Sequence, residues 1–528
     1  MNFMKQFLFR MKKHLPELLL TMLLFIAFLC FYGAGWYIQV YGDIGFDAIL
    51  NTILSGIGGV EKGLYVDFIW SVLLPGAGWT FVIMLTLLSG VLINIMEKLR
   101  TKIGIMSTKP TNNEDGKSST KSNKNTTRKI TGVTVILLTI IMLTNAGKTV
   151  GLFDYVNNLF RQTKILEEHY VNPNEVDITF PEEKRNLIYI FLESMETTYF
   201  DKKEGGALDV NIIPELYDLA EENINFSQNQ SVGGFHSVSG TTWTIGAMVG
   251  QTAGIPLKTP KNLSDMQNGY GKEGKFLPGV TTLSDIFHEN GYVQCLMVGS
   301  RASFGGRSTY YRKHNTDYIY DLGTARMEDI VDSDYFVWWG MEDKHLFDYA
   351  KDKLEFLSQG KEPFAFTMLT VDTHHIGGYV CELCKQEHEQ QYENVISCSS
   401  RQVAEFVDWI KAQDFYENTT IIITGDHPTM DRQYIVKNVQ DNYDRRIYNC
   451  FINAAGEDTY SKNRDFCSLD MFPTTLGALG CTIEGDRLGL GTNLFSGKKT
   501  LIEEMGFEEF NSQVAMGSEY YEREFLEE

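Results

Sequence analysis

"TIIITGDHPTMD", residues 420–431, joins a strand-forming run to a turn with two potential metal ligands. Thr420 to Ile423 are β-branched, as residues of buried strands often are. Gly425 allows the chain to turn, and Asp426 and His427 then stand side by side. An ordinary polar turn and a metal site both explain such a pair, so its interpretation depends on the fold around it.

Strand-like and helix-like patterns alternate along the chain from residue 183 onward. The sequence predicts strands over 186–193, 291–299, 363–371 and 419–425, and helices over 214–226, 343–360 and 399–413. Continuous apolar runs separated by helices are typical of a parallel sheet covered on both faces. We therefore expect an α/β fold with a mainly parallel central sheet, in one domain over about 183–500.

Polar and charged residues follow each predicted strand. The four strands end in Glu193-Ser194, in a loop with Arg301 and Arg307, in "DTHH" (372–375) and in Asp426-His427. In open α/β sheets the ligand crevice lies beyond the carboxyl ends of the strands. Strand ends are often polar, but carboxylates, arginines and histidines together favour one shared site for a metal and an anion.

The chemistry of this set points to phosphoryl groups. Glu193, Asp426 and His427 offer oxygen and nitrogen ligands that suit Mn²⁺, Mg²⁺ or Zn²⁺. A divalent ion polarises a phosphoryl oxygen, and Arg307 can hold another oxygen bidentately. The nucleophile is sought in "SVSGTTWTIGAMVG" (237–250), where hydroxyl groups precede a predicted helix. Free N–H groups at a helix start stabilise anions, although a plain Ser/Thr N-cap explains the same pattern.

The first part of the chain predicts a multi-pass membrane protein. Residues 18–42, 68–96 and 130–147 carry no charged residue. Each run is long enough to cross a hydrocarbon core of about 30 Å, although buried core helices are the alternative. We expect a membrane domain over 1–149 with about three transmembrane helices and a linker over 150–182. The middle run holds Pro75 and nearby glycines, which favours a kinked or re-entrant segment.

Basic flanks predict the orientation in the cell membrane. The segment 98–129 has nine Lys and Arg in a Ser/Thr/Asn-rich stretch that is typical of disorder. This basic segment and the basic N-terminus belong in the cytoplasm, and the loop 43–67 belongs outside. Three crossings then place the α/β domain outside the cytoplasm. The first apolar run lacks a clear cleavage site, which argues against a cleaved signal peptide.

The charge of the chain is uneven. Residues 1–149 hold 15 Lys and Arg against 8 Asp and Glu, residues 150–528 hold 32 against 60, and the whole chain has a net charge of −21. So acidic an outer part repels nucleic acid, which excludes nucleic-acid binding. The acidic tail, 501–528, is expected to form a solvated helix.

Three of the eight cysteines are close together in the sequence. Cys381, Cys384 and Cys398, with His388 between them, have the residue types of a zinc site. Outside the cytoplasm a disulfide within the cluster is the favoured interpretation. Cysteines 295, 450, 467 and 481 are typical of small buried residues.

Four motifs, in this order behind a membrane anchor, resemble the phosphoglycerol transferases of the alkaline phosphatase superfamily. They are "NLIYIFLES", "GTTWTIGAMVGQTAGIPL", "DTHH" and "TGDHP", and the resemblance covers about 183–500. The family includes lipoteichoic acid synthases and periplasmic enzymes that decorate glucans with phosphoglycerol. The residues of the motifs in this sequence resemble those of the glucan-modifying branch more closely. The resemblance implies a sulfatase-like catalytic domain.

The resemblance also implies a role for each site residue. Thr244 is the nucleophile, although Thr241 and Thr242 are close enough to replace it. His374 binds substrate or acts as acid and base, and His375 is the alternative. Arg307 grips the glycerophosphate. The implied metal ligands, for Mn²⁺ or else Mg²⁺ or Zn²⁺, are Glu193, Thr244, Asp426 and His427.

The implied reaction transfers phosphoglycerol in two steps. The donor is phosphatidylglycerol, the intermediate is a phosphothreonine ester, and the acceptor is an extracytoplasmic glycan, glycolipid or glycerophosphate polymer. A phosphoethanolamine transferase of the same superfamily and a catalytically silent membrane protein that binds lipid or polymer are the alternatives. A sulfatase activity needs a C/S-x-P-x-R pattern, which does not occur in the sequence.

Overall fold

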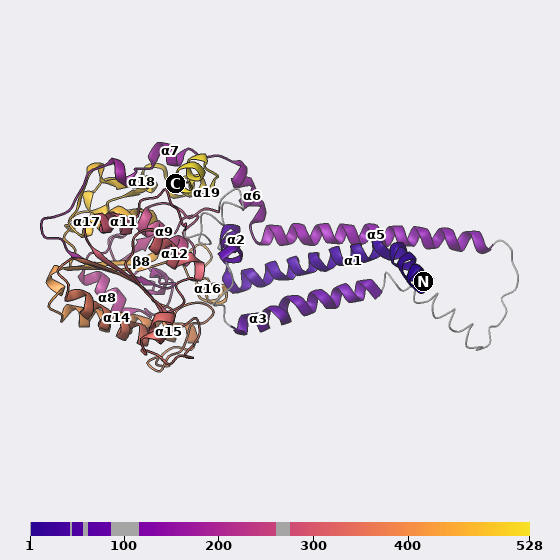
Figure 1. The fold of residues 1–528 in the computed structure, drawn as a ribbon, viewed down its shortest axis with the longest axis horizontal. Helices are drawn as coiled ribbons and strands as arrows, with labels where there is room; N and C mark the ends of the chain where they lie inside the picture. Colours follow the sequence, from indigo (N-terminus) through magenta and orange to yellow (C-terminus); the bar gives the residue numbers. More distant parts are fainter. Residues whose placement is uncertain (1, 43–44, 56–61, 86–115, 260–274, 528) are drawn as a thin grey trace. The chain divides into compact units, whose positions relative to one another are not determined.

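The computed structural model describes residues 2–42, 45–55, 62–85, 116–259 and 275–527, shown in Figure 1. The chain divides into two compact units. One comprises Met1–Gln39 and Lys62–Phe153, and the other comprises Val40–Glu61 and Asp154–Glu528. The predicted domain boundaries at 149, 182 and 500 stay predictions.

Long apolar helices make up the first unit. They are α1 (Asn2–Tyr41), α3 (Lys62–Phe68), which runs on through 74–85, and α5 (Gly116–Thr149). The stretches Leu18–Tyr41, Gly63–Leu85 and Gly132–Thr149 are long and apolar enough to cross a membrane. Large apolar side chains such as Leu18, Trp70 and Leu137 are exposed, as expected when the surrounding solvent is lipid. This unit can therefore anchor the protein in a membrane.

Two segments of the first unit with unusual sequence patterns are both helical. The helix around Pro75 is continuous, and one π-helical turn, η1 (Ile69–Leu73), ends two residues before the proline. A wider turn accommodates a residue that lacks an N–H group. Residues 116–129, predicted to be disordered, are helical because extending an existing helix is inexpensive. Residues 86–96 of the predicted middle run and 98–115 of the basic segment lie outside the described residues.

A seven-stranded sheet organises the second unit, in the order β3-β8-β7-β2-β6-β4-β5. The neighbouring strands from β7 to β5 are parallel, whereas β8 is antiparallel to β7 and β3 to β8. This confirms the predicted α/β fold with a mainly parallel sheet. The strands are β2 (Asn186–Leu192), β3 (Gly234–Phe235), β4 (Val293–Val298), β5 (Tyr318–Tyr320), β6 (Phe364–Leu369), β7 (Thr419–Gly425) and β8 (Ile447–Ile452).

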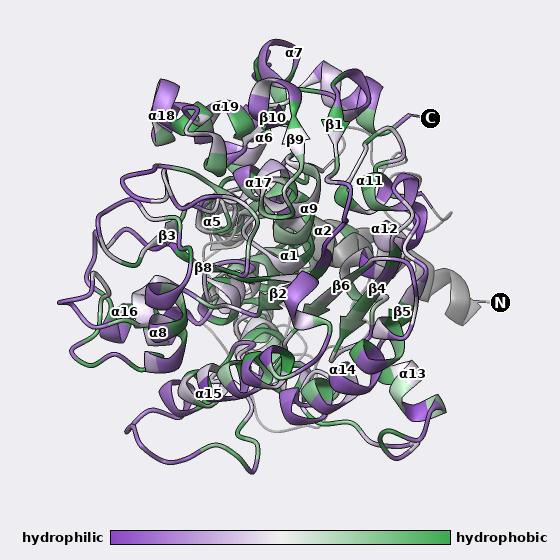
Figure 2. Ribbon diagram, turned by 90° about the vertical axis from the view of Figure 1, so that its left-hand side faces the viewer, coloured by the Kyte–Doolittle hydropathy of each residue, from purple (hydrophilic) through white to green (hydrophobic). Residues whose placement is uncertain are grey.

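Helices cover both faces of this sheet (Figure 1). Leu187, Tyr189 and Phe191 of β2 join one core, and the residues between them join the other, as strand geometry requires. The central strands are mostly hydrophobic, drawn green in Figure 2. On one face lie α8 (Pro214–Glu222), α14 (Asp343–Ser358) and α15 (Gln391–Lys411), and on the other α9 (Thr244–Ala253), α11 (Leu283–Glu289), α12 (Arg307–Lys313) and α17 (Met471–Ala478).

Shorter elements complete the second unit. Two small antiparallel pairs join β1 (Ile178–Thr179) to β9 (Thr482–Ile483) and β10 (Arg487–Leu488) to β11 (Gly491–Thr492). The remaining helices are α2 (Phe46–Ser55), α6 (Leu152–Phe160), α7 (Ile165–His169), α13 (Leu322–Met327), α16 (Arg432–Asn438), α18 (Leu501–Met505) and α19 (Phe507–Ala515), with short 3₁₀ and π turns between elements.

The acidic C-terminal segment does not form a solvated helix. It folds into α18, α19 and a π turn over Tyr521–Phe525. Phe510, Val514, Tyr521 and Phe525 are buried in the same core as α9. The acidic residues that dominate the composition lie on the outer side, where Glu508 is exposed. The sparse apolar residues therefore decide how this segment folds.

Replacing Phe510 by alanine is expected to lower the free energy of unfolding of the second unit by about 3–5 kcal/mol. The Phe510 side chain is 1% exposed, so its removal leaves a cavity in the core. The measurement is denaturant unfolding of the full chain in detergent, with Glu508→Ala as the exposed control. Equal stability of the two variants would contradict the packing of this segment.

Candidate active site

Three potential metal ligands meet at the carboxyl end of the sheet. Glu193 follows β2, and Asp426 and His427 follow β7. One ligand atom of each lies within 4.8 Å of the other two, and all three side chains are buried. His427 Nε2 is 3.3 Å from Asp426 Oδ2 and 3.6 Å from Glu193 Oε1. The structure thus brings together residues that are more than two hundred positions apart in the sequence.

The pairing of β2 with β7 sets this arrangement. Leu192 lies opposite Gly425, so the residues that follow the two strands are neighbours. The Asp426 N–H donates to the Leu192 carbonyl at 3.1 Å, and the Ser194 N–H donates to Asp426 Oδ1 at 2.8 Å. A Cβ on Gly425 would lie 2.0 Å from the Met195 carbonyl oxygen, so a glycine is needed where the two chains approach.

The His427 ring is oriented with Nε2 toward the carboxylates. His427 Nδ1 lies 2.9 Å from the Pro428 carbonyl oxygen. A carbonyl only accepts hydrogen bonds, so Nδ1 carries the proton and the lone pair of the neutral ring is on Nε2. A backbone carbonyl that fixes the ring in this way is a common arrangement behind metal-binding histidines.

Asp426 provides the test of whether a cation fits here. Its Oδ1 accepts hydrogen bonds from Ser194 and His427, whereas its buried Oδ2 accepts none within the described residues. A buried carboxylate oxygen without a donor is costly unless a cation compensates it. With Glu193 and His427 beside it, the donor set of two carboxylates and one imidazole fits Mn²⁺, Mg²⁺ or Zn²⁺.

Metal binding at these residues is expected to strengthen as the pH rises toward and through about 7. Burial, together with the Glu193 carboxylate, raises the pKa of Asp426 to about 7. Burial lowers the pKa of His427, but Asp426 and Glu193 outweigh this effect and raise it. A cation must displace these protons, so affinity rises up to about tenfold per pH unit for each proton released. Calorimetric titration with Mn²⁺ from about pH 6 to about pH 8 measures this.

The same pKa shift of Asp426 gives the metal-free protein the opposite pH dependence. Its pKa is raised above the unfolded value, so its contribution to stability is present at low pH and is lost as the pH rises through about 7. Added Mn²⁺ should therefore raise the unfolding temperature most at the alkaline end of the range. An Mn²⁺ affinity that is independent of pH would contradict both expectations.

Thr244 lies beside this cluster, at the first residue of α9. Its Oγ1 is 3.3 Å from His427 Nε2. The N-cap position is Trp243, and no side chain caps this helix end. The simple interpretation of Thr244 as a helix cap therefore does not apply, and its half-buried hydroxyl faces the metal ligands. Free N–H groups of the first turn are available to an anion at the same place.

Thr241, an alternative nucleophile, is bound into a turn. Its side chain is fully buried, and its hydroxyl donates to the Val238 carbonyl at 2.9 Å and accepts from Ser468 at 3.0 Å. These bonds shape the loop before α9. The geometry therefore favours Thr244 over Thr241.

Arg307 is held rigidly at the start of α12. Gly305 and Gly306 precede it with φ of 65° and 79°, a conformation that favours glycine. The Arg307 guanidinium donates to Ser300 Oγ at 2.8 Å and to the Arg301 and Phe304 carbonyls at 2.9 and 3.1 Å. Burial lowers its pKa to about 10, and Glu193 and Asp426 oppose the shift, so it stays protonated.

The two histidines of "DTHH" have different environments. His374 is half-buried, and its Nδ1 lies 2.9 Å from the His375 carbonyl oxygen. Burial lowers the His374 pKa, although Glu193 opposes the shift, which favours a neutral ring with a lone pair on Nε2. His375 is buried, its ring nitrogens find no hydrogen-bond partner within the described residues, and burial lowers its pKa well below the usual value. Of the two, His374 is the more accessible to substrate.

Sequence reasoning missed several residues that support the site. Glu196 is fully buried and forms an ion pair with Arg445, and it also accepts from the Thr429 N–H at 2.7 Å, two residues beyond His427. Trp339 packs on His374, with ring centroids 4.3 Å apart. Trp339 could have been noticed in the sequence, because it is one of two adjacent tryptophans in "VWWG". No sequence pattern indicates that Glu196 pairs with Arg445.

Comparison with known proteins identifies relatives of this chain. The family model described as Sulfatase matches residues 185–481. A phosphoglycerol transferase I from Escherichia coli is 31% identical over 341 residues, which cover 62% of this chain and 41% of that protein. The chain thus spans about two fifths of the length of this curated relative. The match confirms the resemblance to phosphoglycerol transferases that the motifs predicted.

The solved structures that the comparison found are more distant in sequence. The lipoteichoic acid synthase LtaP from Listeria monocytogenes is 16% identical, with a TM-score of 0.46, over 63% of this chain and 80% of that one. The integral membrane lipooligosaccharide phosphoethanolamine transferase A (EptA) from Neisseria meningitidis is 12% identical, with a TM-score of 0.48, over 88% and 84%. Because the Sulfatase model matches more than half of its residues, the chain belongs to the sulfatase family.

Proposed function

We propose that the protein is a membrane-anchored, metal-dependent phosphotransferase that moves phosphoglycerol from phosphatidylglycerol to an extracytoplasmic glycan, glycolipid or glycerophosphate polymer. The observation that carries the proposal is the position of Thr244 Oγ1, 3.3 Å from His427 Nε2 at a helix start. A hydroxyl next to a base or a metal site is activated as a nucleophile for covalent catalysis. The curated relative named phosphoglycerol transferase supports the choice of group transferred.

In the first proposed step, Thr244 takes the phosphoglycerol group. Its Oγ forms a bond to phosphorus, and the bond from phosphorus to the diacylglycerol oxygen breaks. The hydroxyl proton of Thr244 ends on that oxygen, with His374 as its carrier. The first-turn N–H groups of α9 and the Arg307 guanidinium hold the phosphoryl oxygens during the transfer. A divalent cation, preferably Mn²⁺, held by Glu193, Thr244, Asp426 and His427, supplies Lewis-acid polarisation of the phosphate.

In the second step, an acceptor hydroxyl attacks the phosphothreonine ester. The new bond joins the acceptor oxygen to phosphorus, the bond to Thr244 breaks, and the acceptor proton returns to the threonine oxygen. A neutral His374, favoured by its lowered pKa, suits the base in this step. Arg307 stays charged throughout and holds the glycerophosphate in place.

A membrane-anchored chain is consistent with a lipid donor in the same membrane. Three apolar helices and the basic segment between the second and third favour a multi-pass protein with the α/β unit outside the cytoplasm. A diacylglycerol-linked donor in the same membrane then needs no carrier.

Two other candidate functions are to be tested. A phosphoethanolamine transferase uses the same kind of nucleophile with a different headgroup, and a silent membrane protein binds lipid or polymer without reaction. Hydrolysis of sulfate esters is disfavoured despite the family name, because the chain lacks the C/S-x-P-x-R pattern. Cysteine and serine are thus both missing at the place where a sulfatase needs them.

The test is release of fluorescent diacylglycerol by the purified full chain with Mn²⁺. Fluorescent phosphatidylglycerol and phosphatidylethanolamine are offered in separate detergent micelles. We expect product from phosphatidylglycerol only. Product from phosphatidylethanolamine would favour the phosphoethanolamine transferase, and no product from either lipid would favour the silent protein. Headgroup analysis of glycan and polymer fractions, with and without the protein, then identifies the acceptor.

A further inference from the structure

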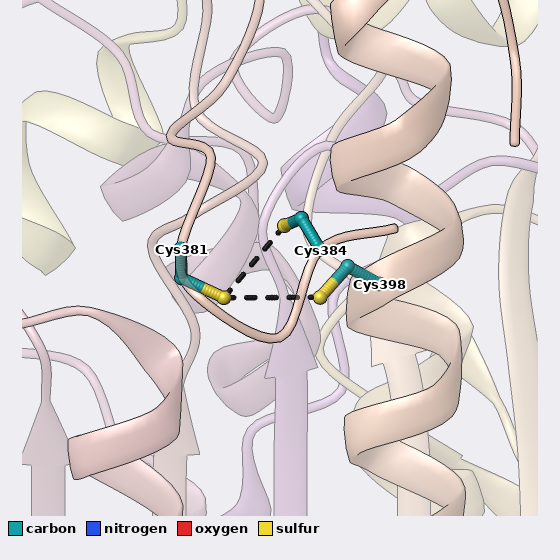
Figure 3. A group of neighbouring side chains, drawn as sticks. All are labelled: Cys381, Cys384 and Cys398. Carbon is teal, nitrogen blue, oxygen red and sulfur yellow. Dashed lines mark hydrogen bonds between the residues drawn. The ribbon is translucent and has the colours of Figure 1, made fainter. Parts of the chain in front are cut away.

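We propose that Cys381, Cys384 and Cys398 form a second metal site, which binds Zn²⁺ with Gln402 as the fourth ligand. Figure 3 shows the three sulfur atoms turned toward one another, two from the loop after the histidines and one from α15. All eight cysteines have free thiols in this structure. Cys381 and Cys398 are buried, and Cys384 is half-buried.

The distances between the sulfur atoms match a zinc site. Cys381 Sγ lies 3.6 Å from Cys384 Sγ and 3.8 Å from Cys398 Sγ. A tetrahedral site with Zn–S bonds of about 2.3 Å has S···S edges of about 3.8 Å. A disulfide needs about 2.05 Å between the sulfur atoms, and three cysteines leave one unpaired. Two of the three S···S distances thus match edges of such a tetrahedron, and the third pair, Cys384 and Cys398, lies within 4.8 Å.

Gln402 is the residue that we assign to the fourth vertex. It lies one helical turn after Cys398 on α15, and its amide Nε2 is 3.4 Å from Cys398 Sγ and 4.0 Å from Cys381 Sγ. The side chain is 7% exposed, and its Oε1 has no hydrogen-bond partner within the described residues. A half-turn of the amide exchanges its nitrogen and oxygen, which brings an oxygen ligand to the sulfur atoms. Zinc accepts oxygen ligands beside cysteine sulfur.

His388, the residue that the sequence suggested as a ligand, is used elsewhere. Its Nε2 lies 3.1 Å from Ser397 Oγ, and it is not among the ligand atoms of the cysteine cluster. The backbone N–H groups of Leu383 and Cys384 instead face the Cys381 sulfur. Such N–H groups stabilise a metal-bound thiolate.

The site links the loop after "DTHH" to the helix behind it. The Tyr379 N–H donates to the Asp372 carbonyl at 2.8 Å, which closes the loop that carries His374, and Cys381 follows two residues later. A zinc ion would fix this segment on α15. It is thus a positioning site, separate from Glu193, Asp426 and His427. Zinc binding itself does not depend on the proposed function; only a contribution to phosphoglycerol transfer would.

Metal analysis of the purified full chain tests the site. To remove ions bound by the first site, zinc is measured by mass spectrometry in the Asp426→Asn background. We expect one zinc ion per chain, its loss when Cys398→Ser is added, and its retention with Cys450→Ser as a buried-cysteine control. Cys450 is not a member of the cluster, and its thiol donates to the Leu219 carbonyl at 3.3 Å.

A second measurement uses the unaltered chain, so its result does not depend on whether a variant folds. Cobalt exchanged into the otherwise unaltered chain should give the intense thiolate-to-metal absorption of a cysteine-rich tetrahedral site. Peptide mapping without reductant should find all three cysteines free to alkylate once the metal is removed. A disulfide between any two of them, or three free thiols without zinc or a cobalt spectrum, would overturn the proposal. Neither result would affect the proposed role of Thr244 as the nucleophile.

Discussion

Replacing Thr244 by alanine is expected to lower the rate of diacylglycerol release from phosphatidylglycerol by at least about 10³-fold. Thr244 Oγ1 is placed 3.3 Å from His427 Nε2, and alanine removes the atom that would bond to phosphorus. The fold should be unaffected, because Thr244 is half-buried and does not cap α9. The measurement is single-turnover release of fluorescent diacylglycerol, with circular dichroism to show that the variant is folded.

Two matched variants separate the role of Thr244 from that of its neighbours. Thr244→Ser keeps a hydroxyl at the same place and should retain measurable release. Thr242→Ala removes a hydroxyl two residues earlier and should retain most of it. Mass spectrometry of the unaltered chain, quenched without acceptor, should find glycerophosphate on the peptide that contains Thr244. The same mass on another peptide would show that the nucleophile is misassigned.

Replacing Asp426 by asparagine is expected to abolish metal-dependent stabilisation and to reduce transfer by at least about 10²-fold. Asparagine can keep one oxygen as acceptor for the Ser194 and His427 N–H groups, which now bond to Oδ1. It exchanges the unpaired Oδ2 for an NH₂ group, which has no lone pair for a cation. The loss is therefore chemical rather than structural.

The stability of the Asp426→Asn variant without metal shows whether its loss of transfer comes from a missing metal ligand or from a damaged fold. At pH 8 Asp426→Asn should be at least as stable as the metal-free unaltered chain, because a buried carboxylate whose Oδ2 has no hydrogen-bond donor has been neutralised. Asp470→Asn is the matched control. Asp470 is also buried, but both of its oxygens accept backbone N–H groups, from Thr492 at 2.8 Å and Cys467 at 2.9 Å. This control should lose about 1–3 kcal/mol of stability and keep its metal. Equal Mn²⁺-dependent stabilisation of the two variants would refute the assigned ligand.

Strand positions could be predicted closely from the sequence because their signals are local. The predicted strand over 419–425 has the bounds of β7. The other three predicted strands differ by one or two residues, at one end of β2 and at both ends of β4 and β6. Helix α15 begins at Gln391, eight residues before the predicted start. Tyr392, Val395 and Ile396 have helical spacing there and are buried, but the cysteines and polar residues between them hid the pattern. The antiparallel strand β8 was not predicted.

The candidate site was predictable to the extent that it depends on strand ends. Residue type and the rule of the carboxyl edge were enough to group Glu193, Asp426 and His427. Contacts that depend on distant segments were not predictable. Glu196 and Arg445 are 249 positions apart, and neither has a neighbour in sequence that indicates a buried ion pair. Which threonine faces His427 also depends on where α9 begins, and boundaries of this kind are set by packing.

The burial of the C-terminal segment has a consequence for how the protein is made. Phe510, Tyr521 and Phe525 share a core with Met248 and Val249 of α9, and the Asn511 side chain accepts from the Ser239 N–H at 2.7 Å, just before that helix. During synthesis the residues around Thr244 leave the ribosome long before these partners exist. The helix that carries the threonine can therefore reach its final packing only after residues 510–525 have been made. Under the proposed function, a chain that lacks these residues would not yet hold Thr244 in its reactive place.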